Sequence, residues 1–167
     1  MAIQPGYAQA ILCGTKNVEF RKRALAPDID TVLVYETAPT QAIVGAFTVG
    51  GMDLASPQIL WRRHWRQAGI CRAAFDRYYA GTRVAVAIFV ASSRRFSQSI
   101  GLAQLDPRPA VPQSFSYLSS DSLEEVRQLQ SLPTSDAVTT TIETVSSTLD
   151  DGLLPMKPGL GVLSGVR

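Results

Sequence analysis

Histidine and cysteine are scarce in this chain, which excludes several kinds of catalytic and metal site. The 167 residues include one histidine, His64, and two cysteines, Cys13 and Cys71. One histidine cannot by itself build a zinc site or a Ser-His-Asp triad, and the two cysteines stand too far apart for a metal-binding pattern. We therefore expect no metal site, an exposed His64, and reduced cysteines packed on helix faces.

Long apolar runs are also missing. No segment reaches the roughly 20 apolar residues that a membrane-spanning helix needs. The first ten residues, MAIQPGYAQA, lack the basic and then apolar build of a secretory signal. The sequence thus predicts a cytoplasmic protein that does not associate with a membrane, and nothing in it implies an organic cofactor.

Charge is distributed unevenly along the chain. Residues 1–118 contain thirteen lysines and arginines against seven acidic residues, whereas residues 119–167 contain three against seven. A basic body favours polyanionic partners, because contacts to phosphates release counterions. The acidic remainder could fold back over the basic face as an internal competitor.

Hydrophobic patterning predicts an α+β domain. Runs of β-rich or alternating residues indicate strands, and helix start and stop signals such as Pro5 and Gly14 indicate short helices. The expected strands cover residues 17–22, 31–37, 42–51, 83–92 and the first part of 94–105, and the expected helices cover 7–13, 56–66 and 71–80. Strands that are mostly neighbours in sequence fit a small, partly open barrel better than a doubly wound sheet.

The chain changes character after Asp106. Three prolines make residues 106–118 extended and irregular, and the capping-box spacing of Ser122 and Glu125 opens a short helix that reaches about Gln130. The remainder is rich in Ser and Thr and then in Gly and Pro, which predicts a poorly packed tail. We therefore divide the chain into a domain at 1–118 and an acidic C-terminal extension at 119–167, weakly structured apart from its one helix.

The basic stretch GTKNVEFRKR contains the pattern G-x-K-x-x-E-x-R, formed by Gly14, Lys16, Glu19 and Arg21. This pattern resembles the hallmark of ASCH domains, a branch of the PUA-like superfamily. Three later segments resemble the same family, namely DTVLVYETAPTQAIVGAFTV, AGICRAAFDRYYAG and PQSFSYL. The resemblance covers about the first 118 residues and leaves the extension unexplained.

The resemblance implies a small PUA-like mixed β-barrel with short helices and with a cleft beside the hallmark residues. The wider superfamily binds RNA or modified bases. Some ASCH proteins are amidohydrolases that act on an acylated cytidine, and others are ribonucleases. The expected ligand is therefore RNA or a modified nucleoside or nucleotide, and the expected cleft residues are Gly14, Lys16, Glu19, Arg21, Arg23, Gln113 and Ser114.

The motif residues carry chemistry that suits such a cleft. Glu19 and Arg21 stand two apart on a predicted strand and therefore share a face. Such a pair can read a base edge, because the carboxylate accepts from an amino group and the guanidinium donates to a carbonyl. Lys16, in the preceding turn, can meet a phosphate or serve as a proton donor if burial lowers its pKa. The plainer interpretation is an ordinary surface ion pair, which contributes little.

An enzymatic function stays open at this point. Lys16 and Glu19 are the candidate catalytic acid–base pair of a small hydrolase, either an amidohydrolase on a modified nucleoside or a ribonuclease. The amidohydrolase members have a hydroxyl residue where this chain has Glu19. They also have a glutamate near the later helix, where this chain offers only Asp76, which a helix salt bridge to Arg72 explains more simply.

The segment LWRRHWRQ combines arginines with two tryptophans. Trp61 and Trp65 are four residues apart, which predicts that both belong to the buried stripe of a helix while the arginines are solvated or contact phosphates. The alternative is that the tryptophans stack on bases.

We therefore expect an RNA- or modified-nucleotide-binding ASCH module with a regulatory role, and hydrolysis by Lys16 and Glu19 is the alternative. A third hypothesis is a protein-interaction adaptor that binds a protein partner through the acidic tail and the helix at 122–130. The sequence does not name the base, the modification or the RNA.

Overall fold

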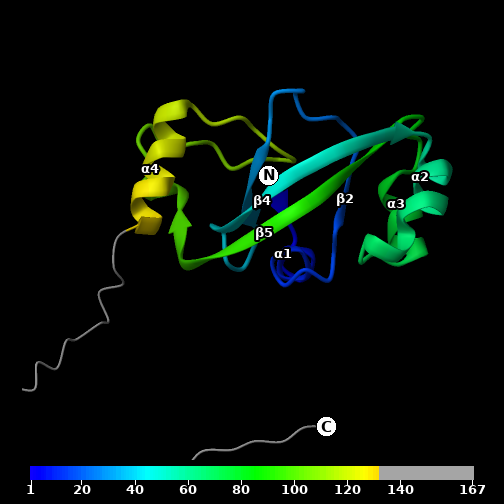
Figure 1. Ribbon diagram of the computed structural model, residues 1–167, viewed down its shortest axis with the longest axis horizontal. Helices are drawn as coiled ribbons and strands as arrows, with labels where there is room; N and C mark the ends of the chain where they lie inside the picture. Colours follow the sequence, from blue (N-terminus) through cyan, green and yellow to red (C-terminus); the bar gives the residue numbers. More distant parts are fainter. Residues whose placement is uncertain (132–167) are drawn as a thin grey trace, which may run out of the picture. The chain divides into compact units, whose positions relative to one another are not determined.

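The computed structural model describes residues 1–131 (Figure 1). In chain order the elements are β1 (Ala2–Ile3), α1 (Pro5–Leu12), β2 (Val18–Arg21), β3 (Thr31–Glu36), β4 (Ala42–Ala55), α2 (Pro57–His64), the 3-10 helix η1 (Trp65–Gln67), α3 (Arg72–Tyr78), β5 (Ala85–Gly101), the 3-10 helix η2 (Leu102–Gln104) and α4 (Ser120–Ser131). Within these residues no helix is both long and apolar enough to cross a membrane.

One mixed sheet contains all five strands, in the order β1-β3-β4-β5-β2. β1 runs parallel to β3, and the remaining neighbours are antiparallel. β1 and β2 are the two edges, and no backbone ladder joins them in residues 1–131, so the barrel is open. The predicted fold class, α+β with a small PUA-like barrel and short helices, is confirmed in this open form.

β4 and β5 form the long central pair of the sheet (Figure 1). The sequence predicts a strand at 83–92 and another from 94, but β5 runs unbroken from Ala85 to Gly101. Its pairing with β4 continues through register shifts, for example between Val49 and Gly51. The first part of β5 is apolar and the second part is mostly polar, and the pairing continues across register shifts between them. The full length of the strand therefore cannot be predicted from a regular alternation of apolar and polar residues.

The helices pack on three clusters of buried side chains. α1 covers a cluster that includes Ile11, Val34, Phe47 and Ile88. α2 and α3, which lie in the connection between β4 and β5, cover a second cluster that includes Val18, Phe20, Leu60, Phe75 and Tyr79. α4 lies at the opposite end of the central pair (Figure 1), on a third cluster that includes Tyr35, Phe96, Ile100 and Val126.

The tryptophans of α2 and η1 have different environments. Trp61 packs against Phe75 with 4.9 Å between ring centroids, whereas Trp65 is 48% exposed. The prediction that both rings belong to a buried stripe is therefore wrong for Trp65. α2 ends at His64, and the tighter 3-10 geometry that follows changes the direction in which Trp65 points.

The expectations for histidine and cysteine also need correction. His64 is half-buried, and its Nε2 lies 2.7 Å from Oδ2 of Asp53, so it is not an exposed helix residue. Cys13 and Cys71 are free but exposed rather than packed, because both lie at helix boundaries: Cys13 follows α1 and Cys71 precedes α3. In the described chain, no group of three His, Cys, Asp or Glu residues is arranged to hold a metal ion.

α4 corresponds to the helix that the sequence predicts at 122–130, but it begins at Ser120, before the predicted cap Ser122. The hydroxyl of Ser119 accepts a hydrogen bond from the amide of Ser122 at 3.1 Å, which caps the first turn. Val126, only 2% exposed, anchors α4 to the sheet. The division of the chain at residue 118 stays a prediction. The rest of the predicted extension, including the acidic tail that could cover the basic face, lies outside the described residues.

Candidate nucleotide pocket

The end of α1 positions the motif. Gly14 adopts φ +79°, a left-handed conformation that glycine tolerates best and that reverses the chain after the helix. The amides of Thr15 and Lys16 then both donate to the carbonyl of Ala10, at 3.0 Å each. These two hydrogen bonds to the last turn of α1 direct the chain into β2, where Val18 and Phe20 face the core.

Lys16 is almost completely buried, with 2% of its surface exposed. Its ammonium donates to the carbonyl oxygens of Val18 at 2.7 Å and Ala68 at 2.5 Å, and lies 3.1 Å from Oε2 of Glu19. Burial lowers the pKa of Lys16, and the Glu19 carboxylate opposes that shift. An ammonium has three donors, and all three are used by these partners.

Glu19 connects Lys16 to Arg21 in a row of three buried charges. Oε1 of Glu19 lies 2.8 Å from a terminal nitrogen of Arg21, and the side chains of both residues are 9% exposed. The same nitrogen of Arg21 donates to the carbonyl of Ala2 in β1 at 2.7 Å. Nε of Arg21 is buried and has no hydrogen-bond partner within residues 1–131. These are not the exposed surface ion pairs of the plainer interpretation.

A cavity of about 340 Å³ opens beside this row of charges, and we call it the motif pocket. It lies where the edges of the barrel approach each other, since both β1 and β2 contribute to its wall. The lining residues come from β1 and its continuation (Ala2, Ile3, Gln4), from the motif (Lys16, Glu19, Phe20, Arg21), and from other segments (Tyr7, Thr37, Ile70, Tyr78, Gln113). The pocket is thus one apolar and aromatic recess with a charged wall.

The structure brings together four of the seven residues predicted for the cleft. Lys16, Glu19, Arg21 and Gln113 line the motif pocket. Three others are not among the lining residues. Gly14 serves the turn, Arg23 is exposed with its guanidinium 5.6 Å from the Phe115 ring, and Ser114 contributes its carbonyl to the amide of Ala2 at 2.8 Å.

Sequence reasoning missed the contribution of β1 and of Tyr78. A strand of two residues, Ala2–Ile3, is too short to show alternation, so nothing in the sequence indicates that it forms a pocket wall. The adjacent tyrosines divide between core and rim: Tyr79 is 4% exposed and Tyr78 is 37% exposed. Tyr78 offers an aromatic ring at the pocket, and the Lys22 ammonium lies 5.1 Å from that ring.

Asp76, the nearest substitute for a catalytic glutamate in α3, lies outside this site. Its carboxylate receives both contacts from Nε of Arg72, at 2.8 and 2.7 Å, and the side chains of both residues are about half exposed. The pairing is the helix salt bridge expected from the spacing of the two residues.

Comparisons of the sequence and of the structure with known proteins identify related ASCH proteins. The chain is 28% identical over 135 residues to an "ASCH domain-containing ribonuclease" of Zymomonas mobilis, and the match covers 78% of this chain and 90% of that protein. The crystal structure of ASCH from Zymomonas mobilis superposes with a TM-score of 0.73 at 25% identity, covering 78% of this chain and 94% of that one. The chain is an ASCH domain protein.

Two further findings accompany this assignment. No family model matches the ASCH chain. The chain is also 29% identical over 103 residues to the large ribosomal subunit protein uL22 of Ureaplasma parvum, which covers 62% of the ASCH chain but 33% of the ribosomal protein. The matches to the Zymomonas protein confirm the family predicted from the G-x-K-x-x-E-x-R pattern. The roles of the individual motif residues stay predictions.

Proposed function

We propose that this ASCH domain binds RNA and that the motif pocket holds one nucleotide of the bound strand. The observation that carries the proposal is the buried, unpartnered Nε of Arg21 at the pocket wall. A buried donor without an acceptor costs about 1–3 kcal/mol. A ligand that supplies an acceptor, such as a base carbonyl, would recover that free energy.

Glu19 complements Arg21 as an acceptor. Each carboxylate oxygen can accept about two hydrogen bonds, and each oxygen of Glu19 contacts one cationic group in the described structure. An amino group on a base edge would therefore find an acceptor beside the Arg21 donor. Tyr78 supplies an aromatic surface on which a base can stack.

Lys16 has a different role in this proposal from the one that the sequence suggested. Because two carbonyl oxygens and Glu19 occupy its three donors, Lys16 has no donor left for a phosphate. Lys16 instead holds the Glu19 carboxylate in place. The relative named as a ribonuclease supports RNA as the ligand class.

The test compares Arg21→Lys with Arg23→Lys, because both keep the charge and only the first removes the Nε–H of a residue that lines the pocket. We expect Arg21→Lys to weaken the binding of single nucleotides about tenfold or more in calorimetric titrations, in line with about 1.5–3 kcal/mol for a hydrogen bond to a charged group. Arg23→Lys should bind like the wild type. Equal affinities for the two variants would show that the motif pocket is not the nucleotide site.

Ribonuclease activity is the second candidate, and the observation that favours it is the match to the Zymomonas protein over 90% of that protein's length. In this function Glu19 would accept the proton of an attacking hydroxyl, and Arg21 would stabilise the charge that develops on the phosphate. Incubation with single-stranded RNA should then yield shorter fragments, and Glu19→Gln should abolish them while circular dichroism shows a folded protein. If the RNA stays intact in the presence of the wild-type chain, the ribonuclease function is refuted and RNA binding without cleavage is the function that stays.

A further inference from the structure

A second surface with the chemistry for RNA lies on α2, η1 and α3. It contains two indole rings and three arginines, and we call it the Trp65 surface: Trp61, Arg62, Trp65, Arg66 and Arg72. Trp65 is one of the large apolar side chains that the domain leaves exposed, at 48%. An exposed indole forgoes much of the free energy that burial of so large a ring provides, so its position calls for a reason.

The rings and guanidinium groups of this surface are already stacked on one another. Trp61 is fixed from below by Phe75, and the ring of Trp65 lies 6.4 Å from that of Trp61 with an interplanar angle of 22°. The guanidinium of Arg66 lies 5.3 Å from the Trp65 centroid, and that of Arg72 lies 5.3 Å from the Trp61 centroid. The surface is therefore preorganised for flat, aromatic groups.

The charge of this region is strongly positive. Between residues 57 and 78 the chain carries five arginines and one acidic residue, Asp76. Asp76 pairs with Arg72, and Asp53 of β4 pairs with Arg63. In the described part of the chain, neither Arg62 nor Arg66 forms an ion pair, so both guanidinium charges are open to an anion.

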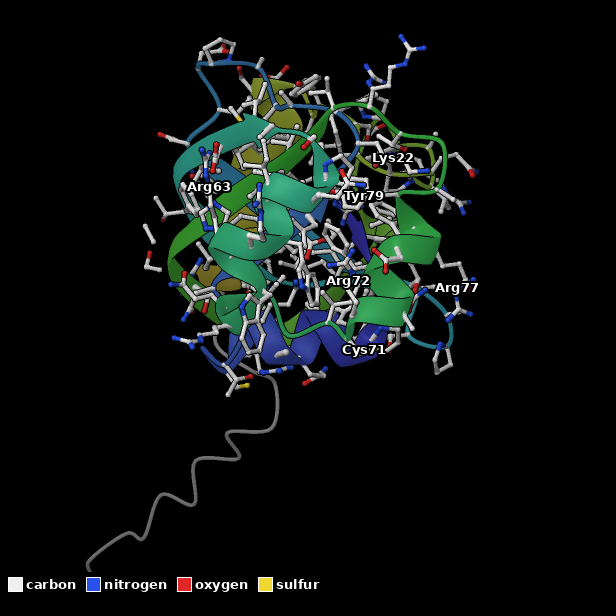
Figure 2. All side chains as sticks on the ribbon, turned by 90° about the vertical axis from the view of Figure 1, so that its right-hand side faces the viewer. Lys22, Arg63, Cys71, Arg72, Arg77 and Tyr79 are labelled. Carbon is white, nitrogen blue, oxygen red and sulfur yellow. The ribbon has the colours of Figure 1, made fainter. Side chains whose placement is uncertain are left out.

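Figure 2 faces the end of the domain that carries α2 and α3, where Lys22, Arg63, Arg72 and Arg77 are labelled. A flat aromatic surface among cations fits single-stranded RNA, because the bases offer π faces and the backbone offers phosphates. An acidic protein segment would satisfy the charges but would not require the indole ring.

The chain segment that follows Trp65 leads to the motif pocket. The segment after Trp65 passes directly over the motif: the carbonyl of Gln67 accepts from the amide of Asn17 at 2.9 Å, and the carbonyl of Ala68 accepts from Lys16. Ile70, two residues later, lines the pocket. A strand with one nucleotide in the pocket would therefore have its neighbouring nucleotides along this segment.

We propose that Trp65 is a stacking platform for a base next to the one in the motif pocket, and that Arg62 and Arg66 contact the adjoining phosphates of single-stranded RNA. This inference rests on the proposed function, because it extends the bound strand from the pocket. It adds a contact that determines affinity for a strand and leaves affinity for a single nucleotide unchanged.

The test measures binding of a 12-nucleotide single-stranded RNA by fluorescence anisotropy, and of single nucleotides by calorimetry, on the full chain. Trp65→Ala and Trp65→Leu are compared, because leucine keeps apolar bulk and removes the π face. We expect both variants to weaken the 12-mer by roughly five- to hundredfold, as base stacking on an aromatic residue predicts. Single nucleotides should bind as they do to the wild type.

The phosphate contacts are tested by salt dependence. Arg66→Gln should reduce the slope of log affinity against log salt by about 0.7, the value for one phosphate contact to a single strand. Arg127→Gln is the matched control, since Arg127 lies on α4 at the other end of the central strand pair (Figure 1). It removes the same charge from the chain and should leave the slope unchanged.

Four results decide the matter. Wild-type affinity of Trp65→Ala for the 12-mer would overturn the platform. Wild-type affinity of Trp65→Leu for the 12-mer would also overturn it, because it would indicate a generic apolar contact. Absence of any RNA binding by the wild type would also overturn it. Loss of 12-mer binding in both Trp65 variants, when the wild type binds no single nucleotide, would support the platform and refute the pocket as the nucleotide site.

Discussion

At the scale of single residues, the central feature is the row of buried charges Lys16, Glu19 and Arg21. Glu19 stands between two cations whose side chains are at most 9% exposed. Removal of one member of a buried ionic network is costly, because it leaves an uncompensated buried charge. The row is thus both the wall of the proposed site and a condition for its stability.

Glu19→Gln tests that dependence. The amide keeps the shape but removes the charge that compensates two buried cations, so we expect a loss of about 3–5 kcal/mol in the free energy of unfolding. Urea denaturation at neutral pH measures it. Asp76→Asn is the control, since its ion pair with Arg72 is about half exposed and should matter by less than about 1 kcal/mol. A Glu19→Gln loss no larger than that of the control would mean that water compensates the charges of the row.

Tyr79 gives the molecule a dependence on alkaline pH. Its hydroxyl donates to the carbonyl of Arg21 at 2.9 Å, and burial raises its pKa well above the usual value of 10.0. The unfolded chain therefore loses the phenolic proton first, near pH 10, while the folded chain retains it. Stability from this group is complete below pH 10 and declines as the pH rises above it.

We expect Tyr79→Phe to lower stability by about 1 kcal/mol at pH 7, the value of one hydrogen bond, and to flatten the decline above pH 10. Urea midpoints from pH 8 to 11 provide the measurement. Burial also raises the pKa of Tyr78, so part of the decline should stay in the Tyr79→Phe variant. Tyr117→Phe, at an exposed site, should keep the full decline. The same slope in Tyr79→Phe and the wild type would contradict this account.

At the scale of elements, the close packing of α1 on β4 depends on Gly45. A Cβ at this position would lie 2.5 Å from the carbonyl oxygen of Arg94 and 2.6 Å from Cδ2 of Leu12. The first contact is with backbone of the paired strand β5, which cannot move without breaking the ladder. The approach of α1, the helix that precedes the motif, thus depends on the absence of a side chain at Gly45.

Gly45→Ala should consequently destabilise the fold by about 2 kcal/mol or more, within the range for overpacking a core. Gly6→Ala in α1 is the matched control. A Cβ there meets nothing within 4 Å, so the substitution should stabilise the helix by roughly 0.5–1 kcal/mol. Thermal unfolding of the two variants decides between them, and a Gly45→Ala variant as stable as the wild type would contradict the packing described.

The sequence predicted the elements that have a local signal. Pro5 and Gly14 bound α1 within two residues, and the alternation of Val18 and Phe20 identified β2. β1 has too few residues for any periodicity, and the full length of β5 depends on register shifts against β4. The charged wall of the pocket was predicted from the motif. The contribution of Ala2, Gln4 and Tyr78 was not, because these residues meet only through tertiary packing.

At the scale of the whole domain, α4 packs on residues that come from the predicted 1–118 domain. Val126 is 2% exposed, and Leu129 packs beside it on the cluster that contains Phe96 and Leu102. The amide of Asp106 also donates to Glu125 at 3.0 Å. The predicted boundary at 118 would separate α4 from these contacts.

A chain that ends at residue 118 should therefore be less stable than one that ends at residue 131. Burial of one valine and one leucine contributes about 1.5–3 kcal/mol each, so we expect a difference of about 3 kcal/mol or more in urea unfolding. A chain of residues 1–131 carrying Val126→Ala should fall between the two. Equal stability of the two truncated chains would support the boundary at 118.

The open seam of the barrel has a consequence for how the protein behaves in a crowded solution. Exposed edge strands are templates on which other chains add strands and aggregate. Here the free edge of β2 lies opposite that of β1, with the Arg21 guanidinium fastened to the Ala2 carbonyl across the gap. Each edge shields the other, and a buried charge stands where an invading strand would have to enter. Arg21, which we assign to recognition, is therefore also expected to hinder self-association through these edges.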